Sequence, residues 1–208
     1  IGGADAKALV ANFSGIIDGQ GHQIKNAKLP GGWAGHGMID TNTGTIRNIA
    51  FINLNGNPVS TNIGIIVTNK GTVENLYVDY VIVSPREGMD LSDQSGPIAT
   101  WADNNSEIRN CIVNLRFAEG STVLPKNQGS IVGKAGGWTG YVKNSYAIVN
   151  NTGVERICAN ENGTVAASTM STSAQFETYA LLKAGADLSM YDSNIWSFGE
   201  NSISFGGL

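Results

Sequence analysis

One phrase recurs along this chain and limits its fold more than any other feature. It reads Gly, any residue, Ile, a polar stretch, then an aliphatic residue, a polar residue and Asn. The Ile always stands two residues after the Gly, and the Asn follows the Gly by 11 residues in the first three copies and by 14 and 15 in the last two. Chains with internal repeats of this length build stacked units rather than one globular core. The copies begin at Gly15, Gly37, Gly64, Gly96 and Gly129.

The spacing of the copies predicts what one unit contains. The repeated glycines lie 22 to 33 residues apart, which holds about three short strands with their turns. Segments 49–52 and 76–81 are rich in the β-branched and aromatic residues that favour strands, and no helical period runs through residues 13–150. One such unit cannot bury its own apolar side. We therefore expect an all-β fold, a right-handed parallel β-helix (solenoid) of about five coils.

Stacked coils would align equivalent residues in columns that run along the solenoid. The predicted internal columns are Ile17, Ile39, Ile66, Ile98 and Ile131; Ile24, Ile46, Val73, Ile108 and Val142; and Leu29, Phe51, Val78, Val113 and Ala147. Asn tolerates left-handed backbone geometry, and its amide can bond to an Asn one coil away. The repeated asparagines therefore predict a structural ladder of Asn26, Asn48, Asn75, Asn110 and Asn144.

The repeat divides the chain into three parts. Residues 1–12 are a lead-in and partial cap with a candidate short helix over 4–11, residues 13–162 are the β-helix, and residues 163–208 are a closing segment. Within the closing segment, 173–184 has the pattern of an amphipathic helix that is capped by Ser173 and ends near Gly185. Together with the segment around Trp196, this helix would cover the strand edges at the C-terminal end of the solenoid.

Insertions are where repeat proteins usually differ in function. One set follows the third strand of the later coils, at residues 84–95, 118–128 and 150–162, and stacking would place the three insertions side by side. A second set lies between the Gly and Asn positions of the fourth and fifth coils. Trp stacks on the apolar face of a sugar ring, while Asp, Asn and Lys bond its hydroxyls. The candidate glycan-binding residues of this second set are Trp101, Asp103, Asn104, Lys134 and Trp138. The alternative is that both Trp side chains fold back over their own coil.

Composition narrows the function classes. Charged residues are only 14% of the 208 residues and the net charge is −4, against roughly 25% charged residues in an average soluble domain. The 13 Lys and Arg form no basic stripe, so we expect no nucleic-acid partner, and no apolar run approaches the ~20 residues of a membrane span. A low charge is typical of secreted β-rich proteins, and we expect an extracellular or cell-surface location. Because the chain begins at Ile1 without a signal-peptide pattern, we interpret it as part of a larger precursor with other domains.

Candidate catalytic and metal-binding residues are few. Asp18 and Asp40 each stand three residues after a repeat Gly. Stacking would place them about 4.8 Å apart, near the roughly 5–9.5 Å of a glycosidase acid pair. We favour a solvated pair, because Val67, Ala99 and Val132 continue that column. The sequence thus predicts no catalytic residue.

No metal or cofactor is expected either. Glu87, Asp90 and Asp93 cluster in one insertion without a calcium-repeat consensus, and His22 and His36 share no metal motif. Of the two cysteines, Cys111 and Cys158, Cys111 replaces an aliphatic residue of the repeat, so we expect it to act as a small buried hydrophobe.

Three segments carry a resemblance to a known family: Phe13–Asn26 (FSGIIDGQGHQIKN), Asn42–Asn48 (NTGTIRN) and Asn69–Asn75 (NKGTVEN). They resemble the GLUG-type repeats of bacterial secreted and surface proteins. The likeness covers roughly residues 13–150, and the tail 192–198 resembles the segment that closes such repeats. The fourth and fifth copies depart from the pattern, since they lack the Gly-Thr before the aliphatic residue. The resemblance implies a β-helix module of adhesin-like proteins, and it implies no single activity.

Three functions are consistent with these features. The leading hypothesis is an extracellular structural or adhesive module, not an enzyme, that presents its insertions to a partner such as a polysaccharide or surface glycan. The first alternative is a polysaccharide lyase or hydrolase built on the β-helix. The second is a self-assembling fibre or phage-tail-like subunit, a homo-oligomer formed through an N-terminal edge that residues 1–12 cover thinly.

Overall fold

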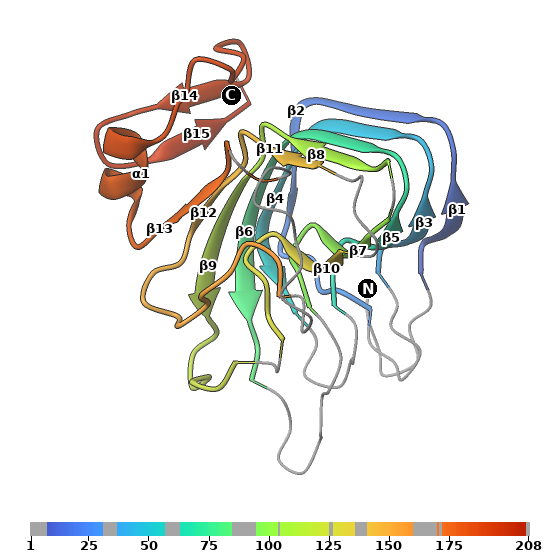
Figure 1. Ribbon diagram of the computed structural model, residues 1–208, viewed down its shortest axis with the longest axis horizontal. Helices are drawn as coiled ribbons and strands as arrows, with labels where there is room; N and C mark the ends of the chain where they lie inside the picture. The colour runs from blue at the N-terminus through green and yellow to red at the C-terminus, as the bar shows by residue number, and fades with distance from the viewer. Residues whose placement is uncertain are drawn as a thin grey trace.

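The computed structural model describes residues 8–30, 37–56, 63–84, 95–103, 105–124, 127–135, 141–159, 170 and 172–206, without the side chains of residues 134, 135 and 141. Strands dominate these residues, and their two large sheets are parallel. The smaller of the two has five strands, one from each repeat, which lie side by side in Figure 1. In sheet order they are β1 (Val10–Phe13), β3 (Ile39–Asn42), β5 (Ile66–Asn69), β7 (Ala99–Ala102) and β10 (Val132–Ala135).

The larger sheet also pairs each strand with its equivalent one repeat away. Strand β6 forms its centre: it pairs with β4 on one side, and with β8 and then β9 on the other. Strand β2 continues beyond β4, β11 continues beyond β8, and β12 and β13 continue beyond β9. The strands are β2 (Ile16–Lys25), β4 (Thr45–Asn55), β6 (Thr72–Ile82), β8 (Glu107–Arg109), β9 (Ile112–Phe117), β11 (Tyr141–Lys143), β12 (Tyr146–Ile148) and β13 (Ala174–Phe176).

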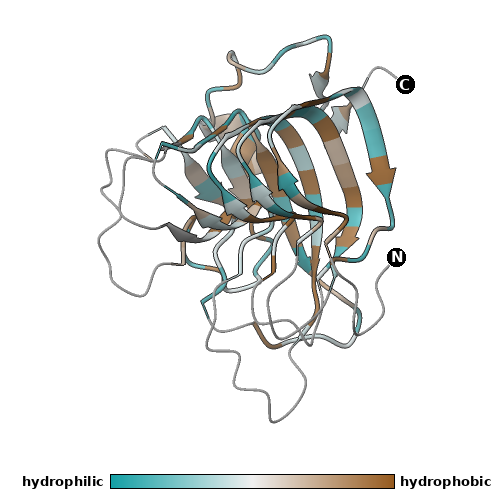
Figure 2. Ribbon diagram, turned by 90° about the vertical axis from the view of Figure 1, so that its right-hand side faces the viewer, coloured by the Kyte–Doolittle hydropathy of each residue, from teal (hydrophilic) through white to brown (hydrophobic). Residues whose placement is uncertain are grey.

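We call the strands of one repeat a rung: β1 with β2, β3 with β4, β5 with β6, β7 to β9, and β10 to β12. Apolar and polar residues alternate along the strands of the large sheet (Figure 2). The apolar positions of successive rungs pair in register and are buried. Burying one such aliphatic side chain stabilises a fold by about 1.5–3 kcal/mol. Two of these buried columns are Ile46, Val73, Ile108 and Val142, and Phe51, Val78, Val113 and Ala147.

Asparagines turn the chain within the second to fifth rungs. Asn48 and Asn75 have φ values of 56° and 53°, inside β4 and β6, and Asn110 and Asn144, with 53° and 45°, separate β8 from β9 and β11 from β12. Left-handed geometry costs most residues about 1–2 kcal/mol, and Asn adopts it more readily than most. The amide of Asn75 also donates from Nδ2 to Oδ1 of Asn48 at 3.1 Å. Asn26, which also has a positive φ, lies elsewhere, since its Oδ1 accepts from Asn53 Nδ2 at 2.8 Å.

The first copy of the repeat is offset from its predicted alignment. Ile17 pairs with Ile46 rather than with Ile39, and Ile24 pairs with Phe51 rather than with Ile46. The predicted first members of all three columns, Ile17, Ile24 and Leu29, are therefore wrong. The reason is that Gly15 begins the same turn as Gly44, not Gly37: the backbone amide of Thr45 donates to the carbonyl of Gly15 at 2.9 Å. A Cβ on Gly44 would lie 2.1 Å from that carbonyl oxygen, so this turn needs Gly.

The first predicted column also shifts in the last two rungs. The residue that pairs with Ile66 is Ala99, and Ala99 pairs in turn with Val132. Ile98 and Ile131 each precede the paired position by one residue, although both are fully buried. The bridge between Ile63 and Ser95 explains the shift, because one residue more separates Ser95 from Ala99 than separates Ile63 from Ile66.

The C-terminal segment differs from the predicted end cap. Residues 174–176, expected in a helix, form β13 and pair with β12. The helix α1 (Tyr179–Gly185) starts later, and its N-cap is Thr178 rather than Ser173. The antiparallel pair β14 (Trp196–Phe198) and β15 (Ile203–Phe205) then packs against the outward side chains of the large sheet, beside which it lies in Figure 1. These outward side chains include Ala50, Tyr77, Ile112 and Tyr146, which come from four successive rungs.

The stack also runs beyond the expected limits at both ends. At the start, Val10 and Ala11 belong to β1 rather than to a helix over 4–11, of which residues 4–7 lie outside the described residues. At the other end, the amide of Ser130 donates to the carbonyl of Arg156, and Val132 bridges to Cys158. Together with β13, residues 156–158 therefore add part of a sixth rung.

Candidate functional site: the outward row at Trp101

One row of residues on the five-stranded sheet contains two positions of the predicted glycan site, Trp101 and Lys134. Register pairs Thr41 with Thr68, Thr68 with Trp101, and Trp101 with Lys134, and Asn12 begins the row beside Thr41. We call these five residues the Trp101 row. Adjacent members lie one rung apart, about 4.8 Å along the stack. The row is therefore an evenly spaced series of positions across five rungs.

Trp101 is the one position in β7 that points to solvent. Its side chain is 44% exposed, whereas Ala99, Thr100 and Ala102 in the same strand are buried. The indole therefore does not fold back into the core of its own rung. A Trp this exposed leaves apolar surface in contact with water, so it offers binding energy to any ligand with a flat apolar face.

An ion pair flanks the row on the next turn. Lys70 Nζ lies 3.4 Å from Asp103 Oδ2, and both side chains are more than 40% exposed. The backbone holds Asp103 in place, because its amide donates to the carbonyl of Asn69 at 2.8 Å and its carbonyl accepts from Ser106 Oγ at 2.8 Å. Asp103 follows Trp101 by two residues, and the fold adds Lys70 of the previous rung to this part of the predicted site.

The other predicted members are only partly described. Asn104 and Trp138 lie outside the described residues, and Lys134 is placed by its backbone alone, directly beside Trp101 in the register. Lys70, Thr41 and Thr68 belong to the same surface and were not predicted. They lie beside Trp101 only because of the register between strands of different repeats. The first predicted column gave that register wrongly, so these residues could not be assigned to the site.

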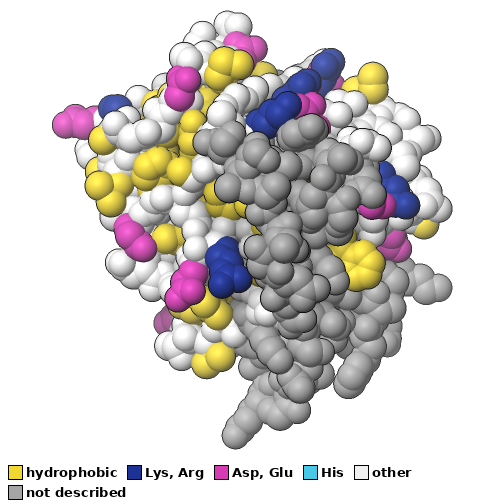
Figure 3. All heavy atoms as spheres, viewed as in Figure 1, with side chains coloured by type: hydrophobic (Ala, Val, Ile, Leu, Met, Phe, Trp, Pro, Cys, Tyr) yellow, Lys and Arg dark blue, Asp and Glu magenta, His cyan; other side chains and the backbone are white. Residues whose placement is uncertain are grey.

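A second feature that was not predicted is a ladder of charged residues on the large sheet, whose first four positions alternate in sign. Asp18, Arg47, Glu74, Arg109 and Lys143 occupy one register position in successive rungs. Arg47 Nε lies 2.9 Å from Asp18 Oδ2, and Arg109 Nη2 lies 2.6 Å from Glu74 Oε2. The same pattern is visible in Figure 3, where Lys and Arg side chains lie next to Asp and Glu. The ladder aligns the rungs. Because it contains both acidic and basic residues, it does not form a surface patch of one charge sign.

The expected stacking of Asp18 on Asp40 is wrong, for the same reason that the first column is offset. Asp18 pairs with Arg47 in the register, whereas Asp40 lies in β3 of the other sheet. Hydrogen bonds from the Asn48 side chain and the Gln20 backbone amide lower the pKa of Asp18, with Arg47 adding to the effect. A glycosidase general acid needs the opposite, a raised pKa.

Other carboxylates of the described residues take part in ion pairs and hydrogen bonds. Glu74 and Glu107 both bind Arg109, at 2.6 Å and 3.0 Å, and hydrogen bonds from Ser189 lower the pKa of Asp187. No group of three His, Cys, Asp or Glu side chains within the described ranges could hold a metal ion. The acidic cluster 87–93 and His36 fall outside those ranges, and His22 Nδ1 lies 2.9 Å from the carbonyl of Gly19.

Cys111 is a core residue, as its place in the repeat predicts. Its side chain is fully buried, and burial raises the pKa of its thiol to about 12. A thiol with so high a pKa is a poor nucleophile at neutral pH. Cys158 is buried as well.

Comparison of the chain with protein-family models, curated proteins and solved structures finds no match. Among the described residues, no helix has the length and apolar character needed to cross a membrane. The site described above therefore supplies the basis for a functional proposal.

Proposed function

We propose that the chain is an adhesive module built as a right-handed parallel β-helix of the GLUG-repeat type, and that its Trp101 row binds a glycan outside the cell. Support for the architecture comes from the parallel pairing of every rung with the next. The left-handed asparagines of the second to fifth rungs add to it, because each of these rungs makes the same turn at the same place. The low charge of the sequence supports a secreted or surface location.

The observation that carries the glycan proposal is the exposure of Trp101 within an evenly spaced polar strip. Apolar C–H faces of sugar rings stack on an exposed indole. Thr41, Thr68 and the Lys70–Asp103 pair supply hydroxyl, ammonium and carboxylate groups at the same surface. A polysaccharide that runs along the stack would meet the Trp and then polar groups at each rung.

Binding to immobilised and soluble polysaccharides tests this proposal. A suitable panel contains β-glucan, galactomannan, arabinogalactan, pectin and mucin glycans, with affinity measured on the intact chain. At least one polysaccharide should bind, and Trp101→Ala should weaken it by tenfold or more. Tenfold corresponds to about 1.4 kcal/mol, which exceeds the roughly 1 kcal/mol that most interface residues cost when they are truncated. The matched control is Leu181→Ala, which removes a side chain of similar exposure from α1.

Two results would remove the proposal. The first is the absence of binding to the whole panel. The second is an equal loss of affinity in Trp101→Ala and Leu181→Ala, since that would assign binding to a general property of the fold. Circular dichroism of both variants establishes that each retains its strands.

Self-association is a second candidate function, favoured by the first rung. Strands β1 and β2 each have a single neighbour within the described structure. Several apolar residues in these strands and just before β1 are exposed: Leu9 by 59%, Val10 by 36%, Ile16 by 69% and Ile24 by 40%. Unpaired strand edges of this kind join to a second chain or to a neighbouring domain. Light scattering over a range of concentrations tests this candidate, which a constant mass near 21.8 kDa would exclude.

A further inference from the structure

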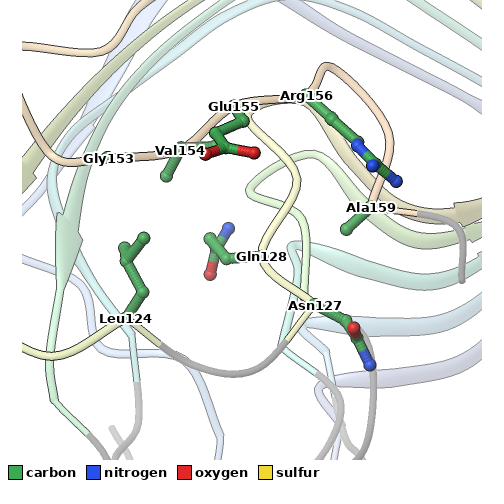
Figure 4. A pocket seen from close by; sticks show the side chains of 8 residues that line it. All are labelled: Leu124, Asn127, Gln128, Gly153, Val154, Glu155, Arg156 and Ala159. Atoms are coloured by element: carbon green, nitrogen blue, oxygen red, sulfur yellow. The ribbon is translucent and has the colours of Figure 1, made fainter.

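A cavity of about 220 Å³ lies on another part of the molecule, between the described ends of the second and third insertions. Leu124 and Gln128 line it from the segment before β10, and Val154, Glu155 and Arg156 line it from the segment after β12 (Figure 4). The two segments were predicted to lie side by side as neighbouring insertions. Their contact forms a pocket that no repeat column predicts.

The amide of Gln128 is the unusual group in this pocket. Its side chain is 93% buried, and Nε2 donates to the carbonyl of Gly129 at 2.7 Å. Oε1 accepts no hydrogen bond in the structure. Figure 4 shows this side chain projecting into the space between Leu124 and Glu155. A buried acceptor without a donor is rare in proteins, because the lost hydration is not replaced, so this oxygen is suited to a donor from a ligand.

The charges around the pocket define which ligands are compatible. Glu155 and Arg156 are exposed, and in Figure 4 the Glu155 carboxylate points toward Val154 and the pocket interior, whereas Arg156 extends toward Ala159. Two acceptors, the Gln128 oxygen and the Glu155 carboxylate, therefore face the part of the pocket near Leu124 and Val154, while Arg156 lines the side toward Ala159. Acceptors repel the oxygens of a phosphate or carboxylate and bind O–H groups.

The volume of the pocket and its apolar wall limit the possible ligands further. A volume of 220 Å³ equals that of about seven liquid waters and is smaller than the roughly 300–1,000 Å³ of pockets for drug-sized ligands. It suits one six-membered ring rather than a chain. Leu124 and Val154 provide an apolar wall, which a sugar ring can meet with its C–H face while its hydroxyls point to the acceptors.

We propose that this pocket binds a single neutral sugar unit, free or at the end of a glycan chain, through hydroxyl groups that donate to Gln128 Oε1 and Glu155. The choice of a sugar as the ligand class rests on the proposed glycan-binding function. The site itself is separate from the Trp101 row, so each can be tested without the other.

Saturation-transfer NMR on the intact chain provides the test, with glucose, galactose, mannose and N-acetylglucosamine as probes and glucuronate and glucose 6-phosphate as anionic controls. At least one neutral sugar should bind with millimolar affinity, and the anionic sugars should bind at least tenfold more weakly. Gln128→Leu should abolish the signal, because Leu fills the same space without the acceptor. Glu155→Gln should weaken binding several-fold. Because Glu155 is exposed, this variant should fold, and it can replace Gln128→Leu in the test if that variant does not fold.

Trp101→Ala separates the two proposals. It should leave monosaccharide binding unchanged while it removes polysaccharide binding to the Trp101 row. The inference is wrong if none of the neutral sugars binds at 50 mM, a concentration about fifty times the ~1 mM dissociation constant expected. It is also wrong if a sugar binds but neither Gln128→Leu nor Glu155→Gln reduces that binding. Polysaccharide binding without monosaccharide binding would overturn the pocket alone, and the reverse result would overturn the Trp101 row alone.

Discussion

Gln23 in the first rung donates from Nε2 to the backbone carbonyl of Phe205 at 2.7 Å, across 182 residues of sequence. Beside it, a Cβ on Gly206 would lie only 2.1 Å from the carbonyl oxygen of Gly21. The β14–β15 hairpin therefore crosses the outer face of the large sheet and reaches the first rung. It joins the rungs along one side instead of closing the end of the stack.

The hairpin should contribute strongly to stability through Trp196. This indole is 3% exposed, and its ring centroid lies 4.7 Å from that of Phe205 and 5.0 Å from that of Tyr191. We predict that Trp196→Ala lowers the free energy of unfolding by about 3–5 kcal/mol, as is usual for a buried aromatic residue. Urea denaturation measures the loss. The matched control is Trp101→Ala, which should cost no more than about 0.5 kcal/mol because its side chain is exposed; equal losses would contradict the packing described here.

At the turn asparagines, Gly should be tolerated better than Ala, which is the opposite of the usual preference inside a strand. Asn75 has a φ of 53°, where Ala is strained and Gly is not. Both substitutions remove the bond to Asn48, so their difference reports the backbone alone. We predict that Asn75→Ala is less stable than Asn75→Gly by about 0.5–1 kcal/mol. At Thr72, in β6 without a positive φ, the Ala variant should instead be more stable than the Gly variant. If Ala is also the more stable of the two at Asn75, the left-handed turn is refuted.

The charge ladder should stabilise the stack modestly and in a salt-dependent way. Glu74 accepts from Arg109 Nε at 2.7 Å, and its side chain is only 15% exposed, whereas that of Arg109 is 41% exposed. Because water reaches the Arg109 side chain and screens its charge, we expect Glu74→Gln to lower the free energy of unfolding by only about 1 kcal/mol. The loss should shrink as the salt concentration of a thermal melt is raised. Glu119→Gln, at an exposed turn, should have no effect, and a comparable loss there would show that net charge alone is responsible.

Stability should fall in acid because of Asp18 and Asp187. Hydrogen bonds lower the pKa of both carboxyls from 3.8 in the folded state. A lowered folded pKa means that each carboxylate stabilises the fold above pH 3.8, and that this contribution is lost as the pH falls through the folded value. Melting temperatures between pH 2 and pH 6, a window that spans the ordinary Asp pKa of about 3.9, should therefore decline toward acid. The decline should be smaller in Asp18→Asn and smaller again when Asp187→Asn is added, whereas an unchanged profile would contradict the assigned hydrogen bonds.

From Gly37 onward, local patterns in the sequence predicted the second and third columns well, because the same residues mark the same turns, whereas the first column shifts by one residue at Ile98 and Ile131. The first copy failed because Gly15-Ile16-Ile17 matches the start of either of two turns, and only the pairing of Thr45 with Ile16 separates them. The helix expected over 173–184 failed at its start for a related reason. Residues 174–176 gain strand bonds from Tyr146–Ile148, and such non-local pairing overrides a local helical pattern.

The sequence predicted only part of the candidate site. Trp101 and Asp103 could be found because they lie in an insertion between the repeat positions. Lys70 could not be assigned to them, because it comes from the previous rung and its approach to Asp103 depends on register. The pocket at Gln128 was beyond sequence reasoning altogether. It forms where two insertions meet, and neither insertion follows the repeat.

The most direct test of the proposed function is a crystal structure of the protein with an oligosaccharide of whichever polysaccharide binds most tightly. The proposal predicts a sugar ring stacked face-on against the indole of Trp101, with the chain extending along the row toward Thr68 and Thr41. An oligosaccharide bound elsewhere on the surface, with the indole of Trp101 left in contact with solvent, would contradict it.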